Sequence, residues 1–187
     1  PTGITRELLH ALREQDAAAG TLLDIGGGVG ALQHELLSAG VDHAVHVDAS
    51  RAYLEASAQE AERQGHGDRI EQYHGDFVDL ADTIAPVDVV TLDRVVCCYP
   101  DMPALVRASA AKAQRLYALS YPRVRWITRA GRRLGNAWFR VRGSCFRTYL
   151  HSPREIEAQV ERNGFRRIAA GRTLLWHAAV YRRVHAG

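Results

Sequence analysis

The sequence predicts a single doubly wound α/β domain with a mostly parallel, seven-stranded sheet. Short apolar runs alternate with helical patterns through most of the chain, a glycine-rich run follows the first apolar run, and two late apolar runs have no helix between them. Such alternation is typical of βαβ units, whose parallel sheet is covered on both faces. The 187 residues, 47% of them hydrophobic, are enough for one core, so we expect one domain over residues 1–187.

The elements follow in order along the chain. Apolar runs predict five strands, which are residues 22–25, 44–47, 70–73, 87–92 and 116–119. Helical spacing predicts four helices, which are residues 4–18, 31–39, 51–64 and 102–113.

A last helix begins near Ser152, because Pro153 suits its first turn and Glu155 completes a capping box. Asn163 and Gly164 end it. Two more strands, residues 165–170 and 174–182, lack an intervening helix, so we expect an antiparallel pair.

Composition excludes several classes of protein. The sequence contains no apolar run of about 18 residues and no signal-peptide pattern, so we expect a soluble, cytoplasmic protein. Cys97, Cys98 and Cys145 offer neither a metal-binding spacing nor a disulfide framework, which fits a reducing compartment. We therefore expect no metal site.

Positive charge is concentrated in one segment. Residues 123–147 contain eight arginines and no acidic residue, while the rest of the chain has 16 basic against 21 acidic residues. We expect residues 123–150 to form an inserted basic cap after the fifth strand. Three interpretations stay open, which are a solvated helix, a cap that covers an anionic substrate, and a helix on anionic lipid. We favour the substrate cap, with Arg140, Arg142 and Arg147 as binding residues, because ligands bind at the carboxyl ends of such strands.

The glycine-rich run lies between the first strand and the next helix. Gly26, Gly27, Gly28 and Gly30 allow a sharp turn and a close approach to a nucleotide-like ligand. The run also satisfies a dinucleotide pattern. Asp24 precedes the turn, where it would oppose the phosphates of a dinucleotide but favour the ammonium and sulfonium groups of S-adenosylmethionine.

Further acidic residues follow the next strands. Asp48, with Ala49, ends the second strand and suits the ribose hydroxyls. After the third strand come Gly75, Asp76 and Phe77, where a carboxylate can accept from the adenine amino group and a ring can cover the base. Asp93 and Arg94 close the fourth strand, where the methionine end of S-adenosylmethionine would lie. The additional acidic strand ends favour this cofactor over a nicotinamide dinucleotide.

These motifs resemble the class I S-adenosylmethionine-dependent methyltransferases over about residues 21–181. The resemblance implies a Rossmann-like methyltransferase fold, with the loop glycines lining the cofactor, Asp48 at ribose, and Asp76 with Phe77 at adenine. A narrower similarity, carried by Tyr99-Pro100, residues 147–151, Glu155 and residues 163–165, is to the magnesium-protoporphyrin O-methyltransferases, which esterify a porphyrin propionate. That family has His before its Tyr-Pro, where this chain has Cys98.

The leading hypothesis is O-methylation of a small-molecule acceptor that contacts Tyr99 and the arginines of the cap. A carboxylate acceptor is ionised at neutral pH and needs no base, whereas a phenol needs one, for which Tyr149 and His151 are the candidates. One alternative is an NAD(P)-dependent oxidoreductase, disfavoured by Asp24 and Asp76. Another is a nucleic-acid methyltransferase, supported by the basic segment and opposed by the net negative remainder. The third alternative is a protein module that binds the cofactor without catalysing a reaction.

Overall fold

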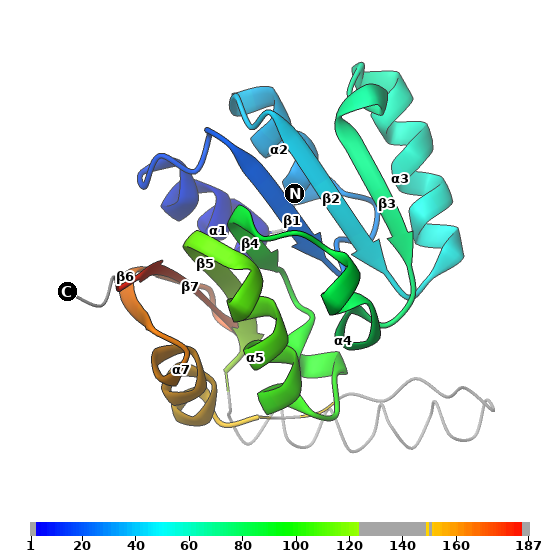
Figure 1. The fold of residues 1–187 in the computed structure, drawn as a ribbon. Coiled ribbons are helices and arrows are strands. Elements are labelled where there is room, and N and C mark those ends of the chain that lie inside the picture. The colour runs from blue at the N-terminus through cyan, green and yellow to red at the C-terminus, as the bar shows by residue number, and fades with distance from the viewer. Residues whose placement is uncertain (1–2, 124–148, 150, 185–187) are drawn as a thin grey trace.

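The computed structural model describes residues 3–123, 149 and 151–184. Their seven strands form one sheet in the order β3-β2-β1-β4-β5-β7-β6 (Figure 1). The strands are β1 (Thr21–Ile25), β2 (His43–Asp48), β3 (Ile70–His74), β4 (Val87–Leu92), β5 (Ala113–Pro122), β6 (Phe165–Arg172) and β7 (Trp176–Arg183). Strands β1 to β5 run parallel, and β7 pairs antiparallel with both β5 and β6. The predicted fold class and the predicted antiparallel pair are therefore confirmed.

Helices cover both faces of the sheet. They are α1 (Gly3–Arg13), α2 (Ala31–Ala39), α3 (Arg51–Gln64), α4 (Phe77–Leu80), α5 (Met102–Lys112) and α7 (Pro153–Arg162), with short 3₁₀ turns at Gly67–Arg69, Ala81–Thr83 and Val96–Cys98. Successive strand residues point to opposite faces, so Leu22 packs with α1 and α2 while Leu23 packs with α4, α5 and α7. Helix α3 shares the face of α2, because Ser57 and Gln33 both reach His46 of β2. Two apolar cores thus enclose the sheet.

Three element boundaries differ from the sequence-based expectation. The first helix was expected over residues 4–18 but ends at Arg13, since Asp16 takes a left-handed backbone with φ 55°. Strand β5 is longer than the expected residues 116–119, because β7 pairs with it as far as Pro122. The short helix α4, capped by Asp76, was not predicted, since four residues give too little periodicity to detect.

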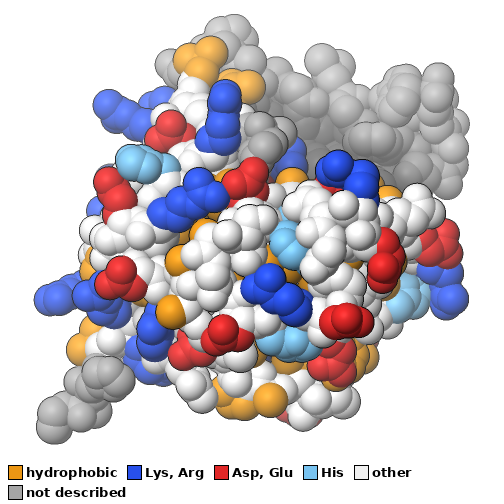
Figure 2. All heavy atoms as spheres, turned by 90° about the horizontal axis from the view of Figure 1, so that it is seen from above, with side chains coloured by type: hydrophobic (Ala, Val, Ile, Leu, Met, Phe, Trp, Pro, Cys, Tyr) orange, Lys and Arg blue, Asp and Glu red, His pale blue; other side chains and the backbone are white. Residues whose placement is uncertain are grey.

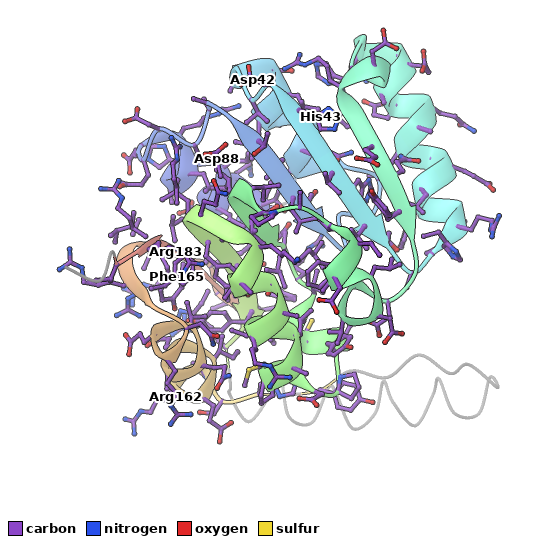
Figure 3. The ribbon with its side chains drawn as sticks, viewed as in Figure 1. Asp42, His43, Asp88, Arg162, Phe165 and Arg183 are labelled. Atoms are coloured by element: carbon purple, nitrogen blue, oxygen red, sulfur yellow. The ribbon has the colours of Figure 1, made fainter. Side chains whose placement is uncertain are left out.

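Side chains at the amino ends of the parallel strands fasten the sheet to its helices. Arg183 of β7 donates hydrogen bonds to the carbonyls of Ala110 and Ala113 at the end of α5 and lies over the Phe165 ring, 4.5 Å from its centroid (Figure 3). Figure 2 looks onto this side and shows acidic and basic side chains interspersed. Within the described part of the chain, no helix has both the length and the apolar character needed to cross a bilayer.

Candidate active site

The candidate site lies at the carboxyl ends of β1, β2 and β4. The chain leaves β1 toward β2 and β3 on one side and returns through β4 and β5 on the other, so the strand order reverses between β1 and β4 (Figure 1). Open α/β sheets bind ligands at such a point. Two adjoining cavities of about 510 and 690 Å³ open there and share Gly26, Tyr53, Val95 and Cys98 in their walls.

The glycine loop is held against the end of β2 by Asp48. The Gly28 amide donates to Oδ2 of Asp48 over 3.0 Å, and the Ser50 amide donates to Oδ1 over 2.8 Å. Gly28 has φ 60°, and a Cβ built on it would meet no atom within 4 Å. The backbone therefore offers an open, side-chain-free surface to a ligand beside an oriented carboxylate.

Asp24, at the carboxyl end of β1, is fully buried and lines the larger cavity. Its Oδ1 accepts a 2.7 Å hydrogen bond from the Thr91 hydroxyl, while its Oδ2 has no hydrogen-bond partner among the described residues. Burial, followed by the neighbouring carboxylates Asp93 and Asp48, raises the pKa of Asp24 to about 7, and the Thr91 hydrogen bond opposes the rise. A cation placed in this cavity would favour the ionised carboxylate.

The end of β4 is fixed by α1 and β5. Asp93 accepts hydrogen bonds from the Thr5 hydroxyl over 2.6 Å and from the Ser120 hydroxyl. Arg94 adopts a left-handed backbone with φ 62°, which is uncommon for a residue with a side chain, and its amide donates to Ser120. Such strain persists where surrounding contacts enforce it, as at functional sites. Its guanidinium stays half-exposed, 3.7 Å from Asp93.

Asp76 and Tyr99 meet across the smaller cavity. Asp76 caps α4 by accepting from the Val78 amide, and it also accepts from the Tyr99 hydroxyl, at 3.0 Å to Oδ1 and 3.1 Å to Oδ2. Burial and the Asp76 carboxylate raise the pKa of Tyr99 to about 12, so this phenol stays neutral at physiological pH. Phe77 lines the cavity but is only 4% exposed, because most of its ring packs into the core.

Tyr149 and His151 lie beside the loop that follows β4. The Tyr149 amide donates to the Cys97 carbonyl over 2.6 Å, and Nε2 of His151 lies 2.9 Å from the Tyr99 carbonyl oxygen. Their rings stack with centroids 6.2 Å apart. His151 lines a further cavity of about 640 Å³ between α5 and α7, which shares Pro100 with the smaller of the two cavities described above.

The cofactor residues predicted from the sequence therefore converge on one edge of the sheet. The predicted cofactor residues that line the two cavities are Asp24, Gly26, Gly27, Gly28, Asp48, Ala49, Gly75, Asp76, Phe77, Asp93 and Arg94. Tyr99, predicted to contact the substrate, lines the smaller cavity. Gly30 lies just beyond them, as the residue that caps α2. Arg140, Arg142 and Arg147, predicted to bind substrate, lie outside the described residues.

Sequence reasoning missed several residues of the cavity walls. Thr5 comes from α1, far from the glycine loop in the sequence, and no motif marked it. Tyr53, the third residue of α3, is 53% exposed, and a large aromatic ring on the exposed face of a helix could have served as a signal. Val95 and Cys98 follow β4 without any pattern that distinguishes them from packing residues.

Comparison with known families identifies the class of enzyme to which the chain belongs. A family profile described as a methyltransferase domain matches residues 3–170. The chain belongs to this methyltransferase family. It is therefore an enzyme of the S-adenosylmethionine-dependent class, and the oxidoreductase alternative falls away. No curated sequence relative matches the methyltransferase.

Solved structures share its fold. Magnesium protoporphyrin IX methyltransferase from Synechocystis PCC 6803, with bound S-adenosylhomocysteine, has a TM-score of 0.75 and 22% identity over 97% of this chain and 82% of that one. A putative sarcosine dimethylglycine methyltransferase from Galdieria sulphuraria has a TM-score of 0.74 and 11% identity, covering 96% and 84%. An O-methyltransferase family 2 protein from Planctomyces limnophilus, in complex with apigenin, has a TM-score of 0.69 and 17% identity, covering 97% and 61%.

Proposed function

We propose that the methyltransferase binds S-adenosylmethionine across the two adjoining cavities and transfers its methyl group to an oxygen of a small-molecule acceptor. The observation that carries the proposal is the buried carboxylate of Asp24, a lining residue of the larger cavity, whose unpartnered Oδ2 lies directly beneath Gly27 of the glycine loop. A buried carboxylate with one open acceptor position fits the cofactor's ammonium group. The two phosphates of a dinucleotide would instead meet a negative charge at the same place.

The smaller cavity suits the adenosine end. Asp48 is oriented by two backbone amides, and its remaining acceptor positions are available for the two ribose hydroxyls. Asp76 lies across the cavity and can accept from the adenine amino group beside the Tyr99 hydroxyl. Ala49, Gly75 and the accessible edge of Phe77 complete this wall.

The larger cavity suits the methionine end. Asp24 would bind the ammonium group, and the half-exposed guanidinium of Arg94 would bind the carboxylate. Asp93, held by hydroxyls from α1 and β5, keeps Arg94 in place. Gly26 and Gly27 leave the backbone bare where the two cavities meet.

The protein's part in the reaction is chiefly positioning. S-adenosylmethionine, when bound, supplies a methyl group already activated on a sulfonium, so the acceptor oxygen needs alignment and exclusion of water. A carboxylate acceptor is ionised at neutral pH and requires no base. For a phenol, His151 is the better placed base, because a proton on Nε2 donated to the Tyr99 carbonyl leaves the Nδ1 lone pair free.

The acceptor would approach from the side of Tyr99, Tyr149 and His151. We propose a small, anionic acceptor, a cap formed by residues 123–150, and a cytoplasmic location for the enzyme. Three features support this acceptor. The cap carries the chain's excess of arginine, the cavity beside His151 adjoins the cofactor cavity through Pro100, and proteins of the same fold include a porphyrin methyltransferase and an apigenin complex.

Titration calorimetry with S-adenosylhomocysteine, NAD and NADP tests the cofactor assignment. We expect micromolar binding of S-adenosylhomocysteine and no measurable binding of either dinucleotide. Binding of NAD or NADP as tight as that of S-adenosylhomocysteine would contradict the assigned cavities.

Methyl transfer from radiolabelled S-adenosylmethionine to a panel of aromatic carboxylates and phenols tests the acceptor class. An ester product releases its label in mild alkali, whereas an aryl ether keeps it. If the cap holds an anionic acceptor, Arg140→Gln with Arg142→Gln should raise KM for the acceptor about tenfold or more and leave cofactor affinity unchanged. Unchanged kinetics would remove these arginines from the substrate site.

A further inference from the structure

His46 lies next to Asp24 beneath the glycine loop. The two residues are register partners on the neighbouring parallel strands β1 and β2, both side chains point to the same face of the sheet, and both are fully buried. Nε2 of His46, like Oδ2 of Asp24, has no hydrogen-bond partner among the described residues. A Cβ on Gly27 would lie 2.4 Å from the Asp24 oxygen and 3.0 Å from the His46 nitrogen, so the two free atoms flank one small space.

The surroundings of His46 define where its proton sits. Its Nδ1 lies 3.1 Å from the Ser57 hydroxyl and 3.3 Å from the Gln33 amide nitrogen, and that amide also donates to Ser57 over 3.0 Å. With the Gln33 amide nitrogen directed at the ring, as it is here, that nitrogen donates and Nδ1 accepts. The proton of the neutral ring is then on Nε2, which turns the atom beside Gly27 into a donor.

The charged groups around this space favour that arrangement. Burial first, and then the carboxylates of Asp93 and Asp48, raise the pKa of Asp24 to about 7, while Thr91 is the one side-chain donor that opposes them. Burial lowers the pKa of His46 to about 4, with Asp48 acting in the opposite direction and His34 reinforcing the fall. At neutral pH His46 is therefore a neutral donor that faces a carboxyl group poised between its two forms.

We propose that His46 is a positioning residue whose Nε2–H stabilises the carboxylate form of Asp24, through a small approach of the two side chains or one bridging water, and so prepares the site for the cofactor's ammonium group. The inference rests on the proposed role of Asp24 in cofactor binding. It explains why two polar side chains are buried together where a parallel sheet ordinarily places apolar ones. Gly27 is part of the arrangement, since a side chain there would fill the space that the two atoms share.

Two spectroscopic measurements test the inference without the cofactor. Long-range ¹H–¹⁵N correlation should show His46 with its proton on Nε2, and an Nδ1–H ring would overturn the proposal. In the ligand-free protein, ¹³C detection of the Asp24 carboxyl gives its titration midpoint. The midpoint should rise by about one pH unit in His46→Leu and return toward the wild-type value in His46→Gln, which restores an N–H donor. An unchanged midpoint in His46→Leu would also overturn the proposal.

Titration calorimetry with S-adenosylhomocysteine between pH 6 and 9 then tests whether His46 affects the affinity for the cofactor product. We expect wild-type affinity to rise through about pH 7 and level off, and His46→Leu to be about fivefold weaker near pH 7 yet close to wild type at pH 9. Equal weakening at every pH would mean that His46 only packs. Asp24→Asn should bind weakly and without pH dependence. Absence of S-adenosylhomocysteine binding in the wild type would contradict the proposed function, whereas the Asp24 titration would still decide the role of His46.

Discussion

The two ends of strands β1 and β4 use the same pair of residue types for different purposes. At the amino end, Asp88 of β4 accepts from both the amide and the hydroxyl of Thr21 in β1, at 2.8 and 3.0 Å, and lies near Arg115 (Figure 3). At the carboxyl end, Asp24 of β1 accepts from Thr91 of β4 and keeps one oxygen without a partner. Asp88 is half-buried and has hydrogen bonds and a nearby arginine, while Asp24 is fully buried and has one oxygen without a hydrogen bond.

The difference distinguishes a carboxylate that holds two strands together from one that we propose binds a ligand. A buried polar atom without a partner costs folding free energy, and the free oxygen of Asp24 lies at the edge of the sheet where the two cavities open. At the amino edge, charged side chains bind the protein's own backbone. Asp88 accepts from the Thr21 amide, and Arg183 donates to backbone carbonyls at the end of α5. At the carboxyl edge, by contrast, Oδ2 of Asp24 has no partner among the described residues.

Replacing Asp48, which we propose binds the ribose hydroxyls, should have the largest effect on binding. Asp48→Ala removes a buried charged acceptor and the anchor of the Gly28 amide, so affinity for S-adenosylhomocysteine should fall by about 1.5–3 kcal/mol, or roughly ten- to a hundredfold. Titration calorimetry measures the loss of affinity.

The matched control is Asp88→Ala. This change should lower the free energy of unfolding, measured in urea, by about 1–2 kcal/mol and leave the affinity for S-adenosylhomocysteine within about twofold of wild type. Equal losses of affinity in the two variants would contradict the assignment of Asp48 to ligand binding and of Asp88 to a structural role.

Filling the space beneath the glycine loop should destabilise the protein more than the same change at the surface. A Cβ on Gly27 meets Asp24 and His46, which cannot move away in the core, so Gly27→Ala should cost about 1–3 kcal/mol in the free energy of unfolding and weaken cofactor binding. At Gly67 a Cβ approaches Glu62 equally closely, but that glutamate is exposed and flexible. Urea unfolding of Gly67→Ala should therefore show less than about 0.5 kcal/mol of change.

Removing the unsatisfied carboxylate should stabilise the free protein while it weakens binding. The pKa of Asp24 is about 7 in the folded protein, above the ordinary value of 3.8, so its contribution to stability is complete below about pH 4 and is lost as the pH rises through 7. The stability of Asp24→Asn relative to wild type should thus grow by about 2 kcal/mol between pH 5 and 8. The comparison is between the two proteins at each pH, because His46, with its pKa lowered to about 4, gives the opposite slope in both. A difference independent of pH would show that Asp24 is ionised throughout.

The smallest effect is expected at the adenine side. Tyr99→Phe removes a donor from Asp76 but leaves the carboxylate and its contact with α4, so affinity for S-adenosylhomocysteine should change by less than about threefold. Asp76→Ala removes the acceptor itself and should weaken binding by about tenfold. If the two variants bind alike, Asp76 serves α4 and not adenine.

Much of the site could be predicted from local sequence because parallel strands bring their carboxyl ends to a common edge. Asp24, Asp48, Asp76 and Asp93 each lie at or just beyond the end of a predicted strand, so their convergence required only the correct strand order. Thr5 and Ser120 could not be found in this way, since their hydroxyls reach Asp93 from α1 and β5 through packing. His46 was equally hidden, because in the sequence it is one residue of a strand whose neighbours are apolar.

The sequence by itself determined the doubly wound sheet, the glycine loop and the acidic strand ends, because periodicity, glycine and the order of strand and helix are local properties of the chain. Tertiary structure alone decided which polar atoms find partners. Thr21 donates both its amide and its hydroxyl to Asp88, whereas Thr91 donates only its hydroxyl, to one oxygen of Asp24. The difference depends on which backbone amide faces each carboxylate across β1 and β4. Burial then sets the charge of Asp24, since desolvation is a property of the packed core and not of the residue.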